Sequence, residues 1–596
     1  MSLTRGIGIG LALSLSAVSG LWAAEATIDA PGADGDLLRL LQSGSLSVAA
    51  VAQDDAAPHE LLSAARADYA TMLGLLYSAG YYSGTVTIRV DGQEAANIPP
   101  LSPPTRVDRI AITVTPGPRF AFSRASIAPL PPDATVPDGF RTGEPAETEV
   151  IRTAVSGAIS DWRDAGHAKA DVSSQSFTAD HRAATLAADV RLTPGPQLTF
   201  GNLFIEGRSS VNDRRLRKIM GLPTGSVFSP QELTRAATRL RRTGVFRSVA
   251  IQEADQIGPN NTLDITATVV DEKPRRIGFG GELSTLEGLS VEGFWLRRNL
   301  FGGAERLRID GAVSGVGGQT GGIDYSASVR IDRPATLSAD TNGFVFAGIS
   351  QDDEDTYLER AGTLAIGFEH YFSDTLTGEI GLSLNYSDVE EDGDRTNFFY
   401  VGLPTGVTWD RRNDALEPTR GIYLAAEAMP FLGLSDTASG LHAKVDARGY
   451  IGFGQDDRVV LAGRLQLGSV VGAGIDEVPP GLLFFSGGGG TVRGQPYKSL
   501  VIDQGGGDTS GGRSFLGLSA EIRTRIAGSF GAVGFFDAGY ISDDSLPGSG
   551  AEFHSGAGVG LRYFTTIGAI RLDIATPVGG DTGDGIQYYI GIGQSF

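Results

Sequence analysis

The chain has 596 residues, no cysteine and a formal net charge of −21. The absence of cysteine excludes a disulfide framework, a cysteine-ligated metal site and thiol catalysis. The negative charge disfavours a nucleic-acid partner, and the six scattered histidines lack metal-binding spacing, so we expect no nucleic acid, metal or cofactor.

Residues 1–26 have the pattern of a secretory signal peptide. Arg5 precedes an apolar run from Ile7 to Val18, and Ala24 and Ala26 offer two cleavage positions. A buried N-terminal helix is the alternative interpretation. Because no later stretch has the roughly 20 apolar residues of a membrane helix, we expect an exported protein that no helix anchors.

Residues 27–273 are predicted to form three α+β repeats. In each repeat a helical run ends at a glycine, and two strands follow. These glycines, Gly80, Gly166 and Gly244, lie 86 and 78 residues apart (166 − 80 and 244 − 166). A repeat of this period indicates an array of small domains, although three unrelated modules remain an alternative. The predicted boundaries are 27–115 (a divergent unit), 116–196 and 197–273.

The third repeat shows the order strand, helix, helix, strand, strand most clearly. Its second helix is predicted to begin at Pro230, with Ser229 as N-cap and Glu232 completing a capping box. Gly244 then supplies the left-handed residue that ends the helix. The βααββ order is therefore our expectation for every repeat.

From residue 274 to 596 the hydrophobic period changes to two. Leu518, Ala520 and Ile522 alternate with Glu521 and Arg523, and similar alternation recurs along this half. Charged residues between apolar neighbours suit a barrel with lipid outside and a wet lumen, and roughly 20 residues per strand and connection predict about 16 antiparallel strands. A secreted β-sandwich or β-helix is the alternative.

One glycine-rich stretch carries a recognisable motif. Val492, Arg493 and Gly494, with Tyr497 shortly after, resemble the V-R-G-(F/Y) loop of the bacterial outer-membrane assembly-factor superfamily, which includes BamA, TamA and two-partner secretion transporters. The resemblance implies that this loop folds back into the barrel and that Arg493 pairs with an acidic residue. Gln495 departs from the usual aromatic residue, and an ordinary external loop is the alternative.

Two later segments resemble the strands that receive this arginine in the superfamily. Phe535, Asp537 and Gly539 match its F-x-D-x-G motif, and Glu521 matches an inward-facing glutamate. The resemblance therefore implies that Asp537 and Glu521 lie beside Arg493. Inside a barrel, a guanidinium and a carboxylate can form two parallel hydrogen bonds.

The resemblance extends over the mature chain. Three POTRA repeats before one barrel are similar to TamA-like assembly factors and unlike BamA, which has five. This implies an outer-membrane barrel with a periplasmic arm, no enzymatic activity, and a role in inserting or secreting β-barrel and autotransporter-type clients. The implied partners are a TamB-like inner-membrane-anchored protein, unfolded outer-membrane proteins and outer-membrane lipids.

In this family the working part is the seam between the first and last barrel strands, here Arg276–Ser284 and Ile586–Gln594. Glycine weakens a strand by about 0.5 to 1 kcal/mol relative to alanine. We therefore hypothesise that the seam opens laterally and templates a client strand, although barrel curvature would also explain these glycines. The candidate seam residues are Gly278, Gly280, Gly591, Gly593 and Phe596.

Client segments could also add to exposed edges of the repeats, for which the candidate strands are Thr85–Val90, Ala170–Phe177 and Ser248–Glu253.

Two other functions compete with client assembly. A two-partner secretion transporter would normally carry two POTRA units and a plug helix, and TamB-coupled phospholipid transport would use the same architecture. A barrel lipase is disfavoured because no histidine stands in a recognisable motif with serine.

Overall fold

The computed structural model describes residues 24–592 apart from 54–55, 101, 133, 320, 392, 506–507, 547, 549 and 567. Most of the predicted signal peptide, together with Gly593 and Phe596, lies outside the described residues. Within them, no helix is long and apolar enough to cross a membrane. The chain forms two compact units, one holding the first two modules and the other most of the third module and the barrel.

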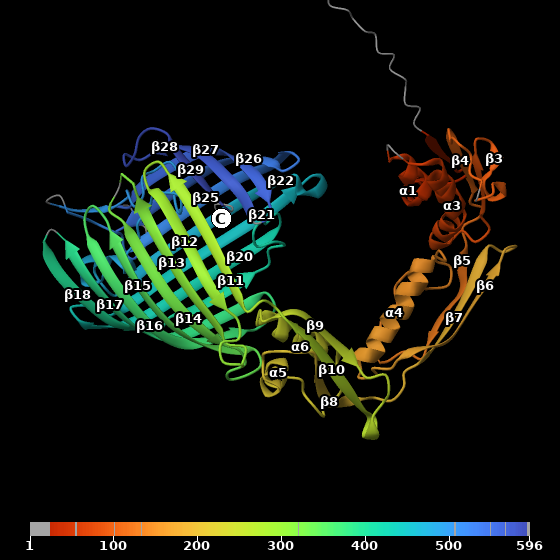
Figure 1. Ribbon diagram of the computed structural model, residues 1–596, viewed down its shortest axis with the longest axis horizontal. Coiled ribbons are helices and arrows are strands. Elements are labelled where there is room, and N and C mark those ends of the chain that lie inside the picture. Colours follow the sequence, from red (N-terminus) through yellow and green to blue (C-terminus); the bar gives the residue numbers. More distant parts are fainter. Residues whose placement is uncertain are drawn as a thin grey trace, which may run out of the picture. The chain divides into compact units, whose positions relative to one another are not determined.

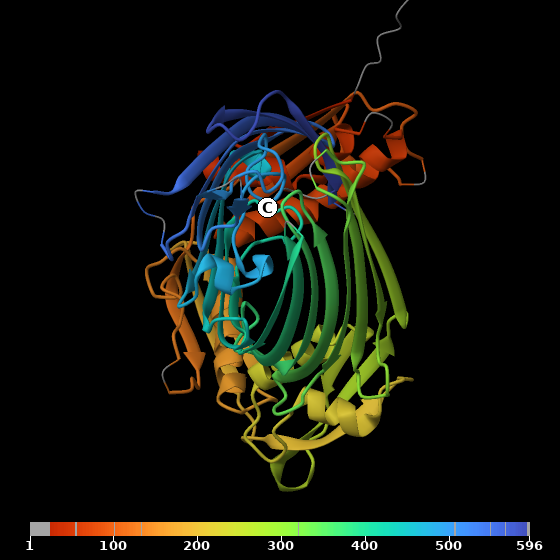
Figure 2. The same cartoon turned by 90° about the vertical axis from the view of Figure 1, so that its left-hand side faces the viewer.

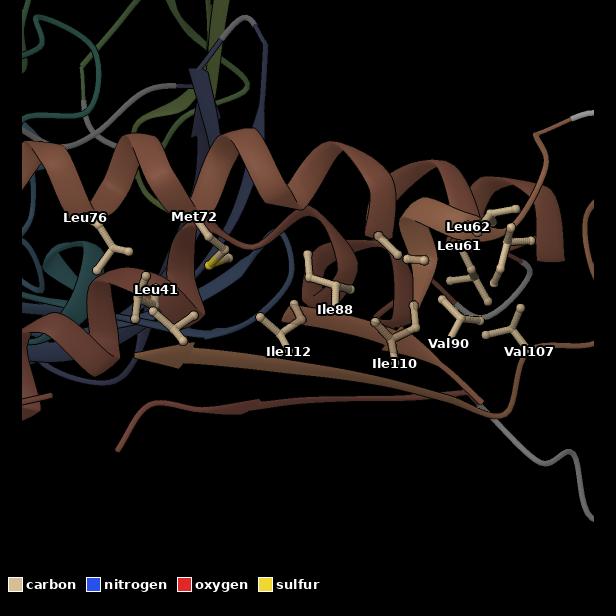
Figure 3. Packing of buried hydrophobic residues seen from close by; sticks show 14 of the residues in the cluster. Leu41, Leu61, Leu62, Met72, Leu76, Ile88, Val90, Val107, Ile110 and Ile112 are labelled. Carbon is tan, nitrogen blue, oxygen red and sulfur yellow. The ribbon is translucent and has the colours of Figure 1, made fainter. Parts of the chain in front are cut away.

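The first module packs three helices against a sheet in the order β1-β4-β2-β3, with β1 parallel to β4. Leu41, Met72 and Leu76 from the helices meet Ile88 and Ile112 from the sheet in its core (Figure 3). Its elements are β1 (Glu25–Asp29), α1 (Gly35–Gly44), α2 (Leu46–Val51), α3 (Pro58–Ser78), β2 (Thr85–Val90), β3 (Gln93–Glu94) and β4 (Arg109–Thr115).

The first module has one α-helix and one short strand more than the expected βααββ order. The second module departs from this order by the loss of a helix. Its sheet has the order β5-β7-β6, and a single α-helix lies among its described residues. Five prolines between residues 129 and 147 explain the difference, because proline removes a backbone donor and clashes with a preceding helical turn. The elements are β5 (Ala121–Ala128), α4 (Thr148–Asp164), β6 (Asp171–Asp180) and β7 (Thr185–Thr193).

The third module has the expected strand, helix, helix, strand, strand order, and its sheet runs β8-β10-β9. The elements are β8 (Thr199–Glu206), α5 (Asp213–Met220), α6 (Pro230–Arg242), β9 (Phe246–Glu253) and β10 (Thr262–Asp271). Of the three strands proposed to offer free edges, β6 and β9 are sheet edges. The expectation is wrong for part of β2, because β3 pairs with Arg89 and Val90.

The second half is a closed antiparallel barrel (Figures 1 and 2), as the sequence predicted. Segments β18 and β19 both pair with β17 and β20, so they are halves of one strand, interrupted at Leu403 and Pro404. The described residues thus contain 16 barrel strands. Outward-facing side chains such as Phe279 and Ile349 are exposed, as a lipid-facing wall requires.

The barrel strands have the following bounds: β11 (Arg275–Ser284), β12 (Gly288–Arg297), β13 (Arg306–Val316), β14 (Asp324–Arg333), β15 (Thr341–Asp353), β16 (Leu358–Tyr371), β17 (Leu376–Glu391), β18 (Asp394–Gly402), β19 (Thr405–Asp410), β20 (Gly421–Ser435), β21 (Gly440–Phe453), β22 (Val459–Val471), β25 (Ser514–Ala527), β26 (Phe530–Ser542), β27 (Glu552–Thr565), β28 (Gly568–Gly579) and β29 (Gln587–Ile592). Between β22 and β25 lies a small hairpin, β23 (Ile502–Gly505) and β24 (Asp508–Ser510).

The third module docks on the barrel through a basic helix. Arg239 of α6 donates two hydrogen bonds to Asp340, in the turn between β14 and β15, at 2.9 and 2.6 Å. The guanidinium of Arg242 stacks 3.9 Å from the ring centre of Tyr371. These contacts explain why most of the module belongs to the same compact unit as the barrel.

The docking is predicted to weaken at acidic pH. Hydrogen bonds from Arg239 hold the pKa of Asp340 below its ordinary value. The stabilisation is therefore present above the unfolded pKa of about 3.9 and is lost as the pH falls through the folded pKa. Asp340→Asn should lose about 1 to 2 kcal/mol of docking free energy at neutral pH. The width of the distance distribution between spin labels on α6 and the barrel measures this.

The matched control is Asp374→Asn, because the exposed Asp374 only reaches Arg242 at 3.5 Å. Two results would contradict the prediction: a distribution for Asp340→Asn equal to that of the wild type at neutral pH, or a wild-type distribution that is the same at neutral and acidic pH.

Candidate functional site

The connection between β22 and β25 brings Arg493 into the barrel. The arginine is 2% exposed, and inward-facing side chains of β25, β26 and β28 surround it. On β26, Phe535 and Asp537 are buried whereas Phe536 is 47% exposed, which places the odd-numbered residues of the motif inside the barrel. The period-two pattern thus orients the strand motif toward the loop.

The guanidinium of Arg493 meets two carboxylates at hydrogen-bond distance. Its Nε donates to Oδ2 of Asp537 at 2.7 Å and its Nη2 to Oδ1 at 3.1 Å, which is a two-pronged pair. Nη1 lies 2.8 Å from Oε1 of Glu521 and 3.6 Å from Oδ2 of Asp573 on β28. The ring centre of Phe535 lies 3.6 Å from the guanidinium carbon. The structure therefore brings together the residues that the resemblance paired.

Glycines allow the loop backbone to approach the barrel wall closely. Gly494 has a φ of +95°, and a Cβ there would lie 2.8 Å from the backbone of Thr576. A Cβ at Gly539 would lie 2.2 Å from Oγ of Ser486 and 3.0 Å from Val492. The buried Val492 thus packs in the space that Gly539 leaves free.

Gln495, which departs from the family motif, is a buried polar anchor. Its Nε2 donates to the carbonyls of Ser555 (2.8 Å) and Gly579 (3.1 Å), and its Oε1 accepts from the Thr582 hydroxyl (2.8 Å). Tyr497 lies apart from this anchor, with the Lys498 ammonium 5.3 Å from its ring centre. The side-chain amide therefore holds the loop tip through hydrogen bonds instead of aromatic packing.

The loop is also bonded to the last barrel strand. The Gly494 N–H donates to the hydroxyl of Tyr589 (3.1 Å), and Nε2 of Gln587 donates to the Gly494 carbonyl (2.9 Å). The Tyr589 hydroxyl in turn donates to Oε1 of Gln587 (2.6 Å), and both side chains are buried. Sequence reasoning missed these two residues, and the alternation of β29 is the signal that could have found them.

The seam between β11 and β29 is described as far as Ile592. In the described residues three pairs join the two strands, Glu282 with Gly591, Leu283 with Ile590 and Ser284 with Tyr589. By comparison, all six described residues of β29 pair with β28. Beyond the last pair, Thr285 exchanges hydrogen bonds of 3.2 and 3.0 Å with Tyr588.

The seam glycines make room for neighbouring side chains. A Cβ at Gly278 would lie 2.3 Å from the Phe294 ring, and one at Gly280 would lie 2.5 Å from the Glu292 carboxylate. Gly591 stands between Arg571 on β28 and Glu282 on β11 in one row of the sheet.

An ion pair crosses the seam over that row. Nη2 of Arg571 lies 2.7 Å from Oε1 of Glu282, and a Cβ at Gly591 would lie 3.0 Å from Nε of Arg571. Oε1 of Glu282 accepts no hydrogen bond among the described residues, so this is a close charge contact. Gly591 therefore leaves the arginine a path across β29.

A serine and a histidine that no sequence motif had joined lie side by side in the structure. Nε2 of His554 lies 2.8 Å from Oγ of Ser486, and Nδ1 lies 2.8 Å from the Thr582 hydroxyl. Both Ser486 and His554 are at most 1% exposed, and the second ring nitrogen meets a hydroxyl instead of a carboxylate. The pair therefore has the surroundings of a structural contact. The described residues also contain no metal-binding cluster of histidine and carboxylate.

Comparison with known families agrees with this geometry. Residues 299–596 match the Omp85 superfamily domain, and residues 198–272 match the POTRA family, described as a surface antigen variable number repeat. The chain belongs to the Omp85 superfamily. The chain is therefore a protein of the bacterial outer membrane. Its third module is a POTRA domain.

Two solved structures share the fold. BamA from Haemophilus ducreyi lacking POTRA domains 1–3 is 17% identical, with 80% of this chain and 100% of that chain covered and a TM-score of 0.60. CdiB from Acinetobacter baumannii is 12% identical, with 80% and 90% covered and a TM-score of 0.53. The three proteins thus have a similar fold over most of their length.

Removal of Arg493 should destabilise the barrel. Arg493→Ala leaves Asp537 and Glu521 buried without this countercharge, which costs about 3 to 5 kcal/mol. The temperature at which the folded barrel loses its compact migration in a detergent gel should fall. Arg493→Lys should recover part of the loss, because a single ammonium keeps the charge but cannot reproduce the fork. An unchanged temperature for Arg493→Ala would show that the pair is dispensable.

Substitution of Gly591 separates two explanations of the seam glycines. Gly591→Val should displace Arg571 from Glu282 and accelerate amide exchange in β29 about tenfold, a loss of about 1.4 kcal/mol. If glycine only weakened the strand, the β-branched residue would slow exchange instead. Gly449→Val is the control, because a Cβ at Gly449 in β21 meets nothing within 4 Å.

Proposed function

We propose that this Omp85 protein is an assembly factor that inserts or secretes β-barrel and autotransporter-type clients through the β11–β29 seam. The observation that carries the proposal lies in the six described residues of β29: all six pair with β28, whereas three pair with β11. A net backbone hydrogen bond contributes about 1 kcal/mol, so among the described residues β29 is held less strongly by β11 than by β28.

An opened seam would offer a template for a client strand. Residues 275–284 of β11 pair with β12 on one side, and Glu282, Leu283 and Ser284 pair with β29 on the other. Once β29 moves away, the backbone donors and acceptors of β11 that it leaves can accept an extended segment by β-augmentation. The client would then form its own sheet from β11 and leave into the membrane.

The loop that holds Arg493 would govern this opening. Gly494 bonds to Tyr589 and Gln587 on β29, so outward movement of the last strand must break these contacts. Arg493 remains fixed to Asp537 and Glu521 on strands away from the seam. The loop thus acts as a tether between a fixed wall and a movable strand.

The modules before the barrel would form the periplasmic arm. Their edge strands β6 and β9 expose the backbone along which an unfolded client could add. A TamB-like inner-membrane-anchored protein is the partner that the resemblance to TamA-like factors implies. These assignments are part of the proposal, and the edge strands support them.

Secretion through the lumen is the first rival. The resemblance to two-partner secretion transporters would imply two modules and a plug helix. In the described chain three sheet modules precede the barrel, and the last α-helix ends at Arg242, before the barrel begins. TamB-coupled phospholipid transport is the second rival, and it does not require the seam to open.

A reversible cross-link at the seam tests the proposal, and the cysteine-free chain allows it without background. Leu283 and Ile590 face each other in the register and are both exposed on the lipid side. We expect a disulfide in Leu283→Cys/Ile590→Cys to deplete outer-membrane barrel proteins, and a reductant to restore them. The measurement is quantitative mass spectrometry of outer membranes.

The matched control is Val345→Cys/Ile366→Cys, which links two facing, exposed residues of the long β15–β16 pair. This disulfide should leave client levels unchanged. If the seam disulfide forms completely and client levels stay the same, passage through the seam is refuted. Secretion or lipid transport would then be measured in the same locked protein.

A further inference from the structure

Positive charge is concentrated in the POTRA domain beside the barrel. Residues 208–247 contain ten arginines and lysines but only Asp213 and Glu232 as acids, in a chain with a net charge of −21. Four of the basic residues, Arg215, Lys218, Arg239 and Arg242, contact the barrel rim. Among the described residues, docking leaves the charge of Lys218 without a counterion, because its partner is a carbonyl oxygen, and it does not account for the other six basic residues.

Helix α5 lies along two turns of that rim. At its start, the Asn212 N–H donates to the carbonyl of Gly302, in the turn between β12 and β13, at 2.9 Å. Toward its end, Nζ of Lys218 donates to the carbonyl of Thr336, in the turn between β14 and β15, at 3.1 Å. Both turns close lipid-facing strands, so α5 is held at the level where the apolar wall ends.

The solvent-exposed face of α5 is cationic. Leu216, Ile219 and Met220 are buried, whereas Arg214, Arg217 and Lys218 are exposed at positions i, i+3 and i+4, which share one helix face. Arg217 and Lys218 bond to carbonyl oxygens, which leaves their charges unneutralised. Arg214 makes no hydrogen bond or ion pair in the part of the chain that the structure describes.

Apolar side chains flank this cationic face on the same two turns. Phe301, next to Gly302, is 73% exposed, and Leu337, next to Thr336, is 68% exposed. Large apolar residues at turns are costly in water but favourable at the boundary between acyl chains and headgroups. Basic residues beside such anchors are attracted to anionic lipid.

We propose that α5 and these two turns form a binding site for an anionic phospholipid of the adjacent leaflet. The phosphate would lie against Arg214 and Lys218, and the acyl chains would lie along Phe301 and Leu337. A bound lipid would brace the POTRA domain against the membrane beside the β14–β15 turn, where Arg239 already holds it. The site does not require client assembly, so it can be tested independently of the proposed function.

Native mass spectrometry of the full-length protein in detergent, titrated with phosphatidylglycerol or phosphatidylcholine, tests the site. We expect phosphatidylglycerol to bind more tightly than phosphatidylcholine. Arg214→Gln/Lys218→Gln should weaken phosphatidylglycerol binding about 25-fold, on the order of fivefold for each surface charge. Phe301→Ser/Leu337→Ser should weaken both lipids, since it removes the acyl contact.

The matched control is Arg235→Gln/Arg247→Gln, which removes the same charge from exposed positions of the same domain outside α5. It should bind phosphatidylglycerol like the wild type. Compact migration in a detergent gel shows that each variant is folded. Equal loss in both charge variants would overturn the site, as would equal binding of the two lipids.

A competition arm distinguishes a lipid from a free anion. Inorganic phosphate at millimolar concentration should not displace phosphatidylglycerol, because the acyl chains contribute to binding. Full displacement would show that the cationic face is an anion site only, and would refute the lipid.

Discussion

An arginine side chain in the lumen wall of a barrel stays protonated. Its positive charge therefore has to be balanced by carboxylates that lie beside it. Arg493 is met by Asp537 and Glu521, and the charges continue outward from these partners. Glu521 also pairs with Arg523, Asp573 pairs with Arg562, and Arg571 reaches Glu282. Four arginines thus face four carboxylates. A buried pair adds little stability by itself, yet removal of one member is expensive.

This balance of charge links strands on the two sides of the seam. The network begins on β25 and β26, passes through β28 and ends on β11, so it spans the seam from the lumen side. The three backbone pairs of the seam that lie in the described residues contribute a few kcal/mol, at about 1 kcal/mol per hydrogen bond. The ion pair of Arg571 with Glu282 adds a side-chain contact across the same junction. These side-chain contacts across the seam can break and form again while the other strand pairs of the barrel stay intact.

The features that repeat along the sequence were the predictable ones. Alternation indicated the barrel and its number of strands, because every strand repeats the same requirement for lipid outside and polar groups inside. The contact of Arg493 with Asp537 and Glu521 followed from motif resemblance, since these residues lie too far apart for any local pattern to join them. The second module lost a helix to its prolines, a local signal that the repeat pattern obscured.

The seam glycines show what composition alone leaves open. Gly278, Gly280 and Gly591 suggested a weak strand, and the structure adds a second role, because their absent side chains give space to Phe294, Glu292 and Arg571. That distinction depends on which residue lies across the sheet, and the register of strands separated by most of the barrel is not encoded locally. Gln495 was visible as a departure from the motif, but its hydrogen bonds to two strand carbonyls required the fold.

The contacts that tether the loop to β29 are polar, and this affects how the seam can open. The bonds from Gly494 to Tyr589 and Gln587 are buried, so each donor and acceptor they release must find a new partner when β29 moves. Water in an opened lumen, or the backbone of an entering strand, can supply those partners, whereas the lipid outside cannot. The same contacts that hold the last strand closed therefore favour opening toward a polar occupant, and they penalise a seam that opens into lipid with nothing to fill it.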